Sequence, residues 1–154
     1  MSLEQEVELI RRVPIFSRLA PAKQKLLCFS SERLTYPAAK ELFAEGSPGD
    51  CCYLIIDGAI EITVQREKDG VTESHTIAVL GPNEICGEIA VFGESKRTAT
   101  ATAKTRLEVL RISADLFRSI VRENPDAAME LIKILAQRLA NTTAHLSVLS
   151  RGGQ

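Results

Sequence analysis

The sequence predicts a mainly β fold, a sandwich or barrel of the jelly-roll (double-stranded β-helix) type, with short helices before it and a long helix after it. Between residues 31 and 112, short apolar segments alternate with turn residues at close intervals, which is typical of all-β domains. On both sides of this region, apolar residues recur at helical spacing. The 154 residues are therefore expected to form one domain, with N-terminal helices over 1–30, the barrel over 31–112 and C-terminal helices over 113–150.

Two short helices are expected before the barrel. Apolar residues at helical spacing, with charged residues between them, predict an amphipathic helix over Glu4–Val13. Pro21 lacks a backbone N–H and suits the first turn of a second helix, which is expected to run to about Cys28.

Turn residues divide the central region into about eight short strands. The loop Glu45–Asp50 contains two glycines and a proline, which favour a tight reversal. Asp57-Gly58 is a strong hairpin signal between two apolar strands, and Asp69-Gly70 marks another turn inside the polar segment Gln65–Gly70. A further turn is expected at Gly81-Pro82-Asn83. The expected strands include Cys52–Ile56, Ala59–Val64, His75–Leu80, Thr98–Ala103 and Leu107–Ile112.

After the barrel, Ser113 is expected to cap a helix that continues to Asn124. Pro125 breaks the pattern, and a longer helix is expected from Asp126 to near Leu149. Along it, residues recur at alternating spacings of four and three, which is typical of a coiled-coil seam. The seam residues are Ala128, Ile132, Leu135, Leu139, Thr142, Leu146 and Leu149. Two interpretations remain open: the seam pairs with a second copy of the chain, or the helix packs only on its own barrel.

Composition and charge argue against several classes of protein. The formal net charge is −1 and no Lys/Arg cluster stands out, so no direct nucleic-acid contact is expected. No apolar run approaches membrane-spanning length and the first residues lack the order of a signal peptide, so a cytoplasmic protein without membrane contact is expected. The cysteines form no Cys-x-x-Cys pair and are expected to be small buried hydrophobic residues rather than metal ligands, with Cys51 and Cys52 on opposite faces of a strand.

The segment Gly87–Ala103 reads G-E-I-A-V-F-G-E-S-K-R-T-A-T-A-T-A and carries the residues most suited to ligand binding. Gly87 leaves room for a ligand against the main chain, and a short helix starting there would turn N–H groups toward an anion. Glu88 offers a bidentate acceptor for hydroxyl groups, and Arg97 a planar guanidinium suited to a phosphate. Together they predict a site for a sugar phosphate or small nucleotide. The alternative is that Glu88 and Arg97 merely pair with each other or with solvent.

This segment and four further blocks resemble the cyclic nucleotide-binding domain family of kinase regulatory subunits, gated channels and catabolite-activator-type bacterial regulators. The loop E-G-x-x-G-D at 45–50 precedes Y-L-I-I-D-G-A-I-E-I at 53–62. L-G-P-N-E-I-C-G-E at 80–88 leads into the family's phosphate-binding cassette, and R-I-S-A-D-L-F with E-N-P-D-A-A resembles its helical exit. The resemblance covers nearly the whole chain. Two departures are Cys86, where the family commonly has Phe, and Lys96, where Pro is frequent.

The resemblance implies a role for each residue of the cassette. Glu88 would accept the ribose 2′-hydroxyl, Arg97 would pair with the cyclic phosphate, and backbone N–H groups would complete the phosphate site. The residues expected to contact the ligand in this segment are Gly87, Glu88, Ile89, Ala90, Arg97, Thr98 and Ala99.

Two features bear on the base and leave cAMP and cGMP both open. Thr98 followed by Ala99 resembles the R-T-A pattern of cGMP-preferring kinases, although bacterial cAMP-binding regulators often carry Ser or Thr there and a strand threonine needs no function. Thr142 and Thr143 match the Thr-Ser pair by which catabolite-activator regulators contact adenine, one residue from each subunit. The implied ligand is thus cAMP or cGMP, with no further cofactor.

The expected function is that of a non-catalytic sensor domain in a bacterial-type signalling or transcription-regulatory system. It would bind a cyclic purine nucleotide and transmit binding through its C-terminal helices, as a homodimer joined by the long helix. The alternative is a dimerisation or protein-interaction module of the same fold that responds to a different effector, such as a redox signal, or to none. An enzyme is the least supported class, because His75 and His145 show no base–nucleophile pairing. Both a stand-alone module and a fragment of a longer protein remain open.

Overall fold

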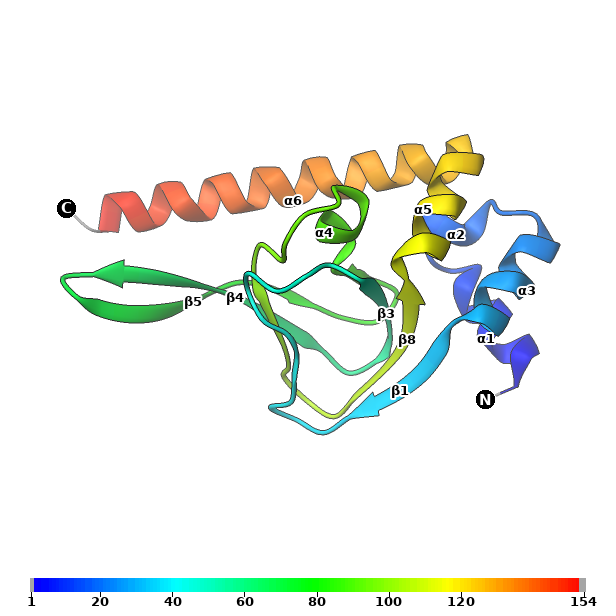
Figure 1. Ribbon diagram of the computed structural model, residues 1–154, viewed down its shortest axis with the longest axis horizontal. Helices are drawn as coiled ribbons and strands as arrows, with labels where there is room; N and C mark the ends of the chain where they lie inside the picture. The colour runs from blue at the N-terminus through cyan, green and yellow to red at the C-terminus, as the bar shows by residue number, and fades with distance from the viewer. Residues whose placement is uncertain (1, 153–154) are drawn as a thin grey trace.

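The computed structural model describes the fold of residues 2–152 and the side chains of residues 2–141. Two four-stranded antiparallel sheets form a jelly-roll-like β sandwich, with short helices at one end and one long helix running along its length (Figure 1). Within the described residues the strands number eight, which confirms the mainly β fold class and the strand count expected from the turns.

The two sheets draw their strands from distant parts of the chain. The first has the order β1 (Glu32–Tyr36), β8 (Leu107–Ser113), β3 (Cys51–Asp57) and β6 (Ile85–Cys86). The second has the order β2 (Glu41–Phe43), β7 (Thr100–Ala103), β4 (Ile60–Lys68) and β5 (Val71–Leu80). Strands that are adjacent in the sequence therefore often pair with strands from remote parts of the chain, as a jelly roll requires.

The prediction of a hairpin at Asp57-Gly58 is wrong. β3 and β4 lie in different sheets, so this turn carries the chain from one sheet to the other instead of pairing its two flanking strands. The turn itself is tight, because Gly58 has φ +91° and a side chain there would collide with the backbone of the 105–107 segment. β3 is already flanked by β8 and β6, which leaves no edge on which β4 could pair.

The turn at Asp69-Gly70 is confirmed and joins a long hairpin. Asp69 and Gly70 both have positive φ, +54° and +78°, between the paired residues Lys68 and Val71. The strand expected to end at Val64 instead continues through the polar residues as far as Lys68, because these residues pair along β5. This two-stranded arm extends beyond the sandwich and lies below the far end of the long helix (Figure 1). Polar side chains are tolerated there because they are exposed.

The N-terminal region differs from the expectation in the end of its first helix and in one additional short helix. The helices are α1 (Leu3–Ile10), α2 (Pro14–Ser17) and α3 (Pro21–Ser30). The first was expected to reach Val13, but Val13 precedes a proline and is extended, with φ −91° and ψ 117°. A residue before proline disfavours helical geometry, so α1 ends early and Pro14 starts a separate turn.

The C-terminal helices follow their local signals. Ser113 caps α5 (Ala114–Glu123) by accepting a hydrogen bond from the Leu116 N–H, as predicted. Pro125 separates it from α6 (Pro125–Gly152), again as predicted. Among residues 2–152, no helix combines the length and hydropathy of a membrane-spanning helix.

The hydrophobic core has two parts, one on each face of the first sheet. One lies between this sheet and the helices and includes Phe16, Leu54 and Phe117. The other lies between the two sheets and includes Ile55 and Ile60. Cys52 belongs to the first part and Cys51 to the second, which confirms that they point to opposite faces; all four cysteines are buried thiols. The candidate functional site opens where the second sheet meets α6.

Candidate functional site

A cavity of about 680 Å³ lies between the β4–β5 hairpin, the short helix α4 (Glu88–Phe92) and one face of α6. Its sheet side is formed by residues of β4 and β5 that are apolar except for Arg66, near the exposed end of β4. The apolar cavity residues on this side are Ile62, Val64, Ile77, Ala78 and Leu80. The end at α4 is polar and is formed by the segment 87–99, which we call the cassette. The cavity thus offers an apolar wall at one side and charged groups at one end.

Gly87 sets the geometry at the start of α4. It has φ +91°, a conformation that residues with a Cβ rarely adopt. A Cβ at this position would lie 2.6 Å from Nη1 of Arg97 and 3.4 Å from the carbonyl oxygen of Cys51. The glycine therefore permits both the turn into the helix and the close approach of the arginine.

Glu88 is fully buried, with no exposed surface. One carboxylate oxygen accepts a hydrogen bond from Nη1 of Arg138 on α6, whose Nη2 donates to the carbonyl oxygen of Ile85. The other carboxylate oxygen, Oε2, has no hydrogen-bond partner among the groups that the structure describes. Burial raises the pKa of Glu88 above its ordinary value, and the nearby charge of Arg138 acts in the opposite direction.

Arg97 is also buried, with 3% of its surface exposed. Nη1 donates to the carbonyl oxygen of Gly87 at 2.9 Å, and Nη2 donates to that of Cys51 at 2.6 Å. The guanidinium lies over the ring of Phe43, 4.0 Å from its centroid, within cation–π distance. Within the described part of the chain, Nε has no partner. The guanidinium is thus held from two sides and retains one donor without an acceptor.

The loop Glu45–Asp50 holds the backbone of Arg97 in place. The N–H of Arg97 donates to the carbonyl oxygen of Ser47 at 2.7 Å, and its carbonyl oxygen accepts from the N–H of Gly46 at 2.8 Å. The Asp50 carboxylate lies 3.7 Å from Nη2 of Arg97 but is exposed to solvent, so it screens the charge only weakly.

The cassette residues expected from the sequence gather around one cavity. Those that line it are Gly87, Glu88, Ile89, Ala90, Arg97, Thr98 and Ala99. Glu88 and Arg97 do not pair with each other, and both are buried, so the interpretation in which they pair mutually or with solvent is wrong. Thr142 and Thr143 lie outside the residues whose side chains are described.

Sequence reasoning missed Arg138 and Phe43, which contact Glu88 and Arg97 respectively. A signal for Arg138 existed in its helical spacing. It lies four residues after Ile134 and three before Asn141, on a face of the helix distinct from the expected seam. Nothing in the local sequence links Phe43 to an arginine that follows it 54 positions later. That contact depends on how β2 pairs with β7, the strand that follows the cassette.

The raised pKa of Glu88 predicts a distinctive dependence of stability on pH. The native state holds this proton more tightly than the unfolded chain, whose carboxyl titrates near 4.5, so the free energy of unfolding falls as pH rises above that value. In Glu88→Gln this contribution is absent. Urea denaturation from about pH 4 to pH 7 should show the stability of the wild type declining relative to that of the variant.

Glu67→Gln, at an exposed position on the β4–β5 arm, is the matched control and should not show this trend. A wild-type stability that rises relative to Glu88→Gln over the same range would mean that the ion pair with Arg138 outweighs burial, contrary to the prediction.

Comparison with known proteins identifies the family of this chain. The profile of the cyclic nucleotide-binding domain matches residues 33–124, more than half of the chain. The chain is 31% identical over 142 residues to a CRP-like cAMP-activated global transcriptional regulator of Mycobacterium tuberculosis, covering 92% of this chain and 62% of the relative. It is 33% identical over 137 residues to the cyclic AMP receptor protein of Thermus thermophilus, covering 89% and 62%. The chain thus spans less than two thirds of the length of these relatives.

A solved structure gives the same result. The catabolite activator protein of Thermus thermophilus superposes with a TM-score of 0.72 at 32% identity, over 89% of this chain and 63% of that chain. The matched profile includes the loop Glu45–Asp50, the cassette and α5, the elements that form or support the charged end of the cavity. The chain therefore belongs to the cyclic nucleotide-binding domain family.

Proposed function

We propose that this chain is a non-catalytic sensor domain that binds a cyclic purine nucleotide. The observation that carries the proposal is the pair of buried charged groups at one end of the cavity, each with one polar atom that no described protein group satisfies: Oε2 of Glu88 and Nε of Arg97. Buried polar atoms almost always have partners, and each exception calls for an explanation. A ligand that brings a hydroxyl donor and an anionic acceptor to the same site supplies both.

The proposed roles follow from this chemistry. The phosphate lies against Arg97, whose planar guanidinium is oriented by two carbonyl oxygens and a ring. The ribose hydroxyl donates to Glu88, and the N–H groups of Ile89 and Ala90 at the start of α4 face the phosphate. The purine lies against the apolar wall of β4 and β5.

Contacts from α4 to the C-terminal helices support a role in signalling. Arg138 joins Glu88 to α6. On the other side, Nε of Arg118 on α5 donates to the carbonyl oxygen of Val91 in α4 at 2.8 Å. A ligand that contacts Glu88 or moves α4 therefore acts directly on both helices. It shifts their positions only to the extent that it binds one arrangement more tightly than the other.

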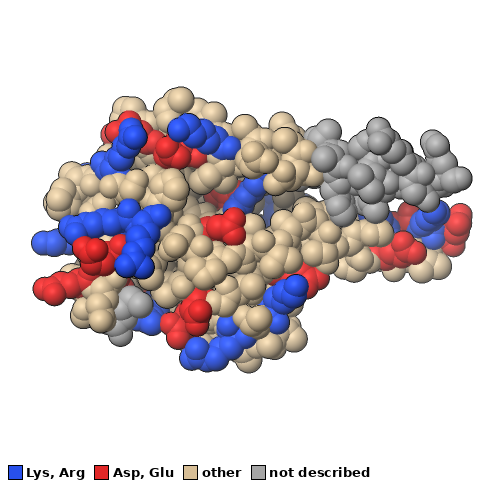
Figure 2. Space-filling view, turned by 180° about the vertical axis from the view of Figure 1, so that it is seen from behind, with Lys and Arg blue, Asp and Glu red and all other residues tan. Residues whose placement is uncertain are grey.

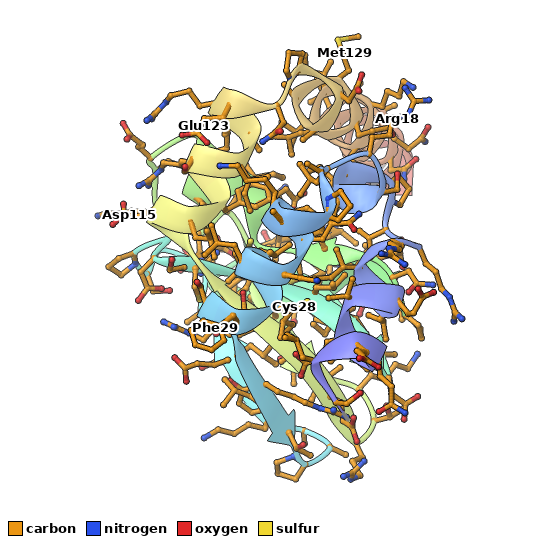
Figure 3. All side chains as sticks on the ribbon, turned by 90° about the vertical axis from the view of Figure 1, so that its right-hand side faces the viewer. Arg18, Cys28, Phe29, Asp115, Glu123 and Met129 are labelled. Carbon is orange, nitrogen blue, oxygen red and sulfur yellow. The ribbon has the colours of Figure 1, made fainter. Side chains whose placement is uncertain are left out.

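A homodimer through α6 is also part of the proposal. Ile132 and Leu139 of the expected seam are 57% and 69% exposed, and neighbouring Met129 points away from the rest of the molecule (Figure 3). Ala128 and Leu135 of the same seam pack against the core of their own chain. The described half of the seam thus contains residues that pack on their own barrel and residues that are free to pair with a second copy of the chain. A second copy would cover the exposed Ile132 and Leu139.

Placing a charge in the exposed part of the seam should separate the subunits. For the double variant Ile132→Glu and Leu139→Glu, sedimentation equilibrium is expected to show a monomer where the wild type is a dimer, because the carboxylates would be buried against apolar partners. Phe29→Glu, an exposed apolar residue on α3, is the matched control and should remain dimeric (Figure 3). A monomeric wild type would contradict the proposal.

Catalysis is not part of the proposal. His75 lies on β5 beside Glu73, with 3.5 Å between Nε2 and Oε2, and is not a lining residue of the cavity. On the face shown in Figure 2, basic and acidic side chains are interspersed over the surface. Among residues 2–141, the buried charged side chains are Glu88 and Arg97 of the cassette. Their contacts suit binding, because the guanidinium is oriented and the carboxylate is held by an arginine.

Thermal unfolding of nucleotide-stripped protein tests the proposed function. A cyclic nucleotide at about a hundred times its dissociation constant adds roughly 2.7 kcal/mol, which raises the Tm by about 5–10 °C for a domain of this size. 5′-AMP is the control, because it carries the same base and sugar without the cyclic phosphate. If neither cAMP nor cGMP shifts the Tm of protein confirmed to be empty, the chain is instead an interaction module of this fold that responds to another effector or to none.

A further inference from the structure

We propose that Arg118 on α5 is a positioning residue that transmits occupancy of the phosphate end of the cavity to α5, separately from the contact by which Arg138 joins the ribose end to α6. Arg118 does not line the cavity, so it acts through the cassette and not on the ligand itself. This assignment rests on the proposed function, because it names how the occupied site acts on each C-terminal helix.

The two connections begin at opposite ends of α4, which lies beneath α6 and beside α5 (Figure 1). Arg138 binds the carboxylate of Glu88, the first residue of α4 and the group proposed to accept the ribose hydroxyl. Arg118 binds near the other end, where its Nε donates to the carbonyl oxygen of Val91 at 2.8 Å. The contact to α6 therefore includes a side chain of the ligand site, whereas the contact to α5 does not.

The segment that Arg118 holds leads directly to the phosphate-binding arginine. The N–H of Ser95 donates to the carbonyl oxygen of Ala90 at 3.0 Å, which closes the end of α4, and Glu94 adopts φ +52°. This left-handed conformation suits glycine better than glutamate, but glutamate brings a carboxylate toward Arg118. Arg97 follows three residues later. A phosphate bound to Arg97 and to the first turn of α4 therefore acts on a segment that is attached to α5.

Arg118 has partners on both sides of the joint between the cassette and α5. On the cassette, Oε1 of Glu94 lies 3.8 Å from its Nε, in addition to the bond with Val91. On its own helix, Oδ1 of Asp115 lies 3.6 Å from its Nη1. Both carboxylates are exposed, so neither ion pair is strong by itself. If the cassette moves away from α5, Asp115 remains as a partner three residues back, and the guanidinium is not left unpaired.

A second contact restricts the directions in which α4 can move. Gly49, in the loop Glu45–Asp50, packs so closely on the cassette that a Cβ there would lie 2.5 Å from Cβ of Ala90 and 3.0 Å from the carbonyl oxygen of Ser95. Closely packed atoms resist further approach, so α4 cannot shift toward this loop. A displacement of α4 on ligand binding is therefore expected to change its contacts with α5 and α6.

Hydrogen exchange measured by mass spectrometry separates the two connections. The nucleotide-stripped chain is compared with the chain saturated with cAMP or cGMP, whichever binds more tightly, and with the 2′-deoxy form of that nucleotide. The 2′-deoxy form keeps the cyclic phosphate but lacks the hydroxyl proposed to bind Glu88. The complete nucleotide should change amide exchange by about fivefold or more in α5 and in residues 125–141 of α6. The 2′-deoxy form should change α5 to the same extent and α6 much less.

Substitution of Arg118 should remove one response and keep the other. In Arg118→Met, the complete nucleotide is expected to change exchange in α6 but not in α5. The affinity should stay within about fivefold of the wild type, because the side chain does not line the cavity. Arg118→Lys keeps the charge without the planar fork and should retain part of the α5 response. Arg122→Met, at an exposed arginine four residues further along α5, is the matched control and should respond as the wild type does.

Arg138→Met should give the reverse pattern, with a response in α5 and none in α6. A normal α5 response in folded Arg118→Met, with the Tm without ligand as the check on folding, overturns the assignment. So does an α5 response that requires the 2′-hydroxyl, or failure of the 2′-deoxy form to bind, because the phosphate end would then not act by itself. All three results leave the proposed function intact. Failure of both cAMP and cGMP to bind overturns the proposed function and this assignment together.

Discussion

Arg97→Ala is expected to weaken binding of a cyclic nucleotide by about 10- to 150-fold. Hydrogen bonds to a charged partner contribute about 1.5–3 kcal/mol, and a change of 1.4 kcal/mol is tenfold in affinity. The structure favours a large effect, because the guanidinium is buried and already oriented by Gly87, Cys51 and Phe43. Little side-chain entropy is therefore lost when the phosphate binds. Isothermal titration with the preferred cyclic nucleotide measures the change.

Arg97→Lys separates charge from geometry. Lysine keeps the positive charge but cannot donate to two carbonyls and a phosphate in one plane, so its affinity should fall between those of the wild type and Arg97→Ala. The alanine variant also leaves the carbonyl oxygens of Gly87 and Cys51 without their donors, so its Tm without ligand must be measured beside its affinity. An affinity within threefold of the wild type for folded Arg97→Ala would refute the proposed phosphate site.

Gly87→Ala is expected to damage both stability and binding. The backbone at φ +91° is unfavourable for any residue with a Cβ, by about 1–2 kcal/mol. In addition, the new Cβ would lie 2.6 Å from Nη1 of Arg97, which must move and lose its hydrogen bond to the Gly87 carbonyl oxygen. We expect a fall in the Tm of several degrees and a loss of nucleotide affinity of about tenfold or more. Thermal unfolding without ligand and isothermal titration measure the two effects separately.

Gly70→Ala provides the matched control for this change. Gly70 also has positive φ, +78°, but lies at the tip of the β4–β5 hairpin, and a Cβ there has no atom within 4 Å. It should show the backbone strain alone: a lower Tm with unchanged affinity. If Gly87→Ala behaves in the same way, the contact between Gly87 and Arg97 does not contribute to the binding site, and the argument for the oriented guanidinium fails.

The structure also explains why both charged groups of the site can be buried. Glu88 is balanced by Arg138, which approaches from α6, and Arg97 by two carbonyl dipoles and the ring of Phe43. A buried charge without such partners would be strongly unfavourable. The contact that stabilises Glu88 is thus also the contact that ties α6 to the cassette. In the proposed sensor, any ligand group that binds Glu88 acts on this same connection.

Features that depend on a few consecutive residues could be predicted from the sequence. Ser113 and Pro125 defined the limits of α5 because a side-chain cap and a missing N–H act on neighbouring backbone groups. Asp69-Gly70 defined a hairpin because both positions need positive φ. Gly87, Glu88 and Arg97 were identified as site candidates because their chemical types and spacing suit a sugar phosphate.

Only the tertiary structure decided which elements became neighbours. Asp57-Gly58 has the local chemistry of a hairpin turn, yet its two strands enter different sheets because β8 and β6 already flank β3. Likewise, Arg138 lies 50 positions after Glu88 and Phe43 lies 54 positions before Arg97. Turns and caps are determined by short-range sterics and hydrogen bonding, so the sequence alone specifies them. Strand partners and the ion pair with α6 are selected by competition among many burial arrangements of the whole chain, so they become visible only when it is folded.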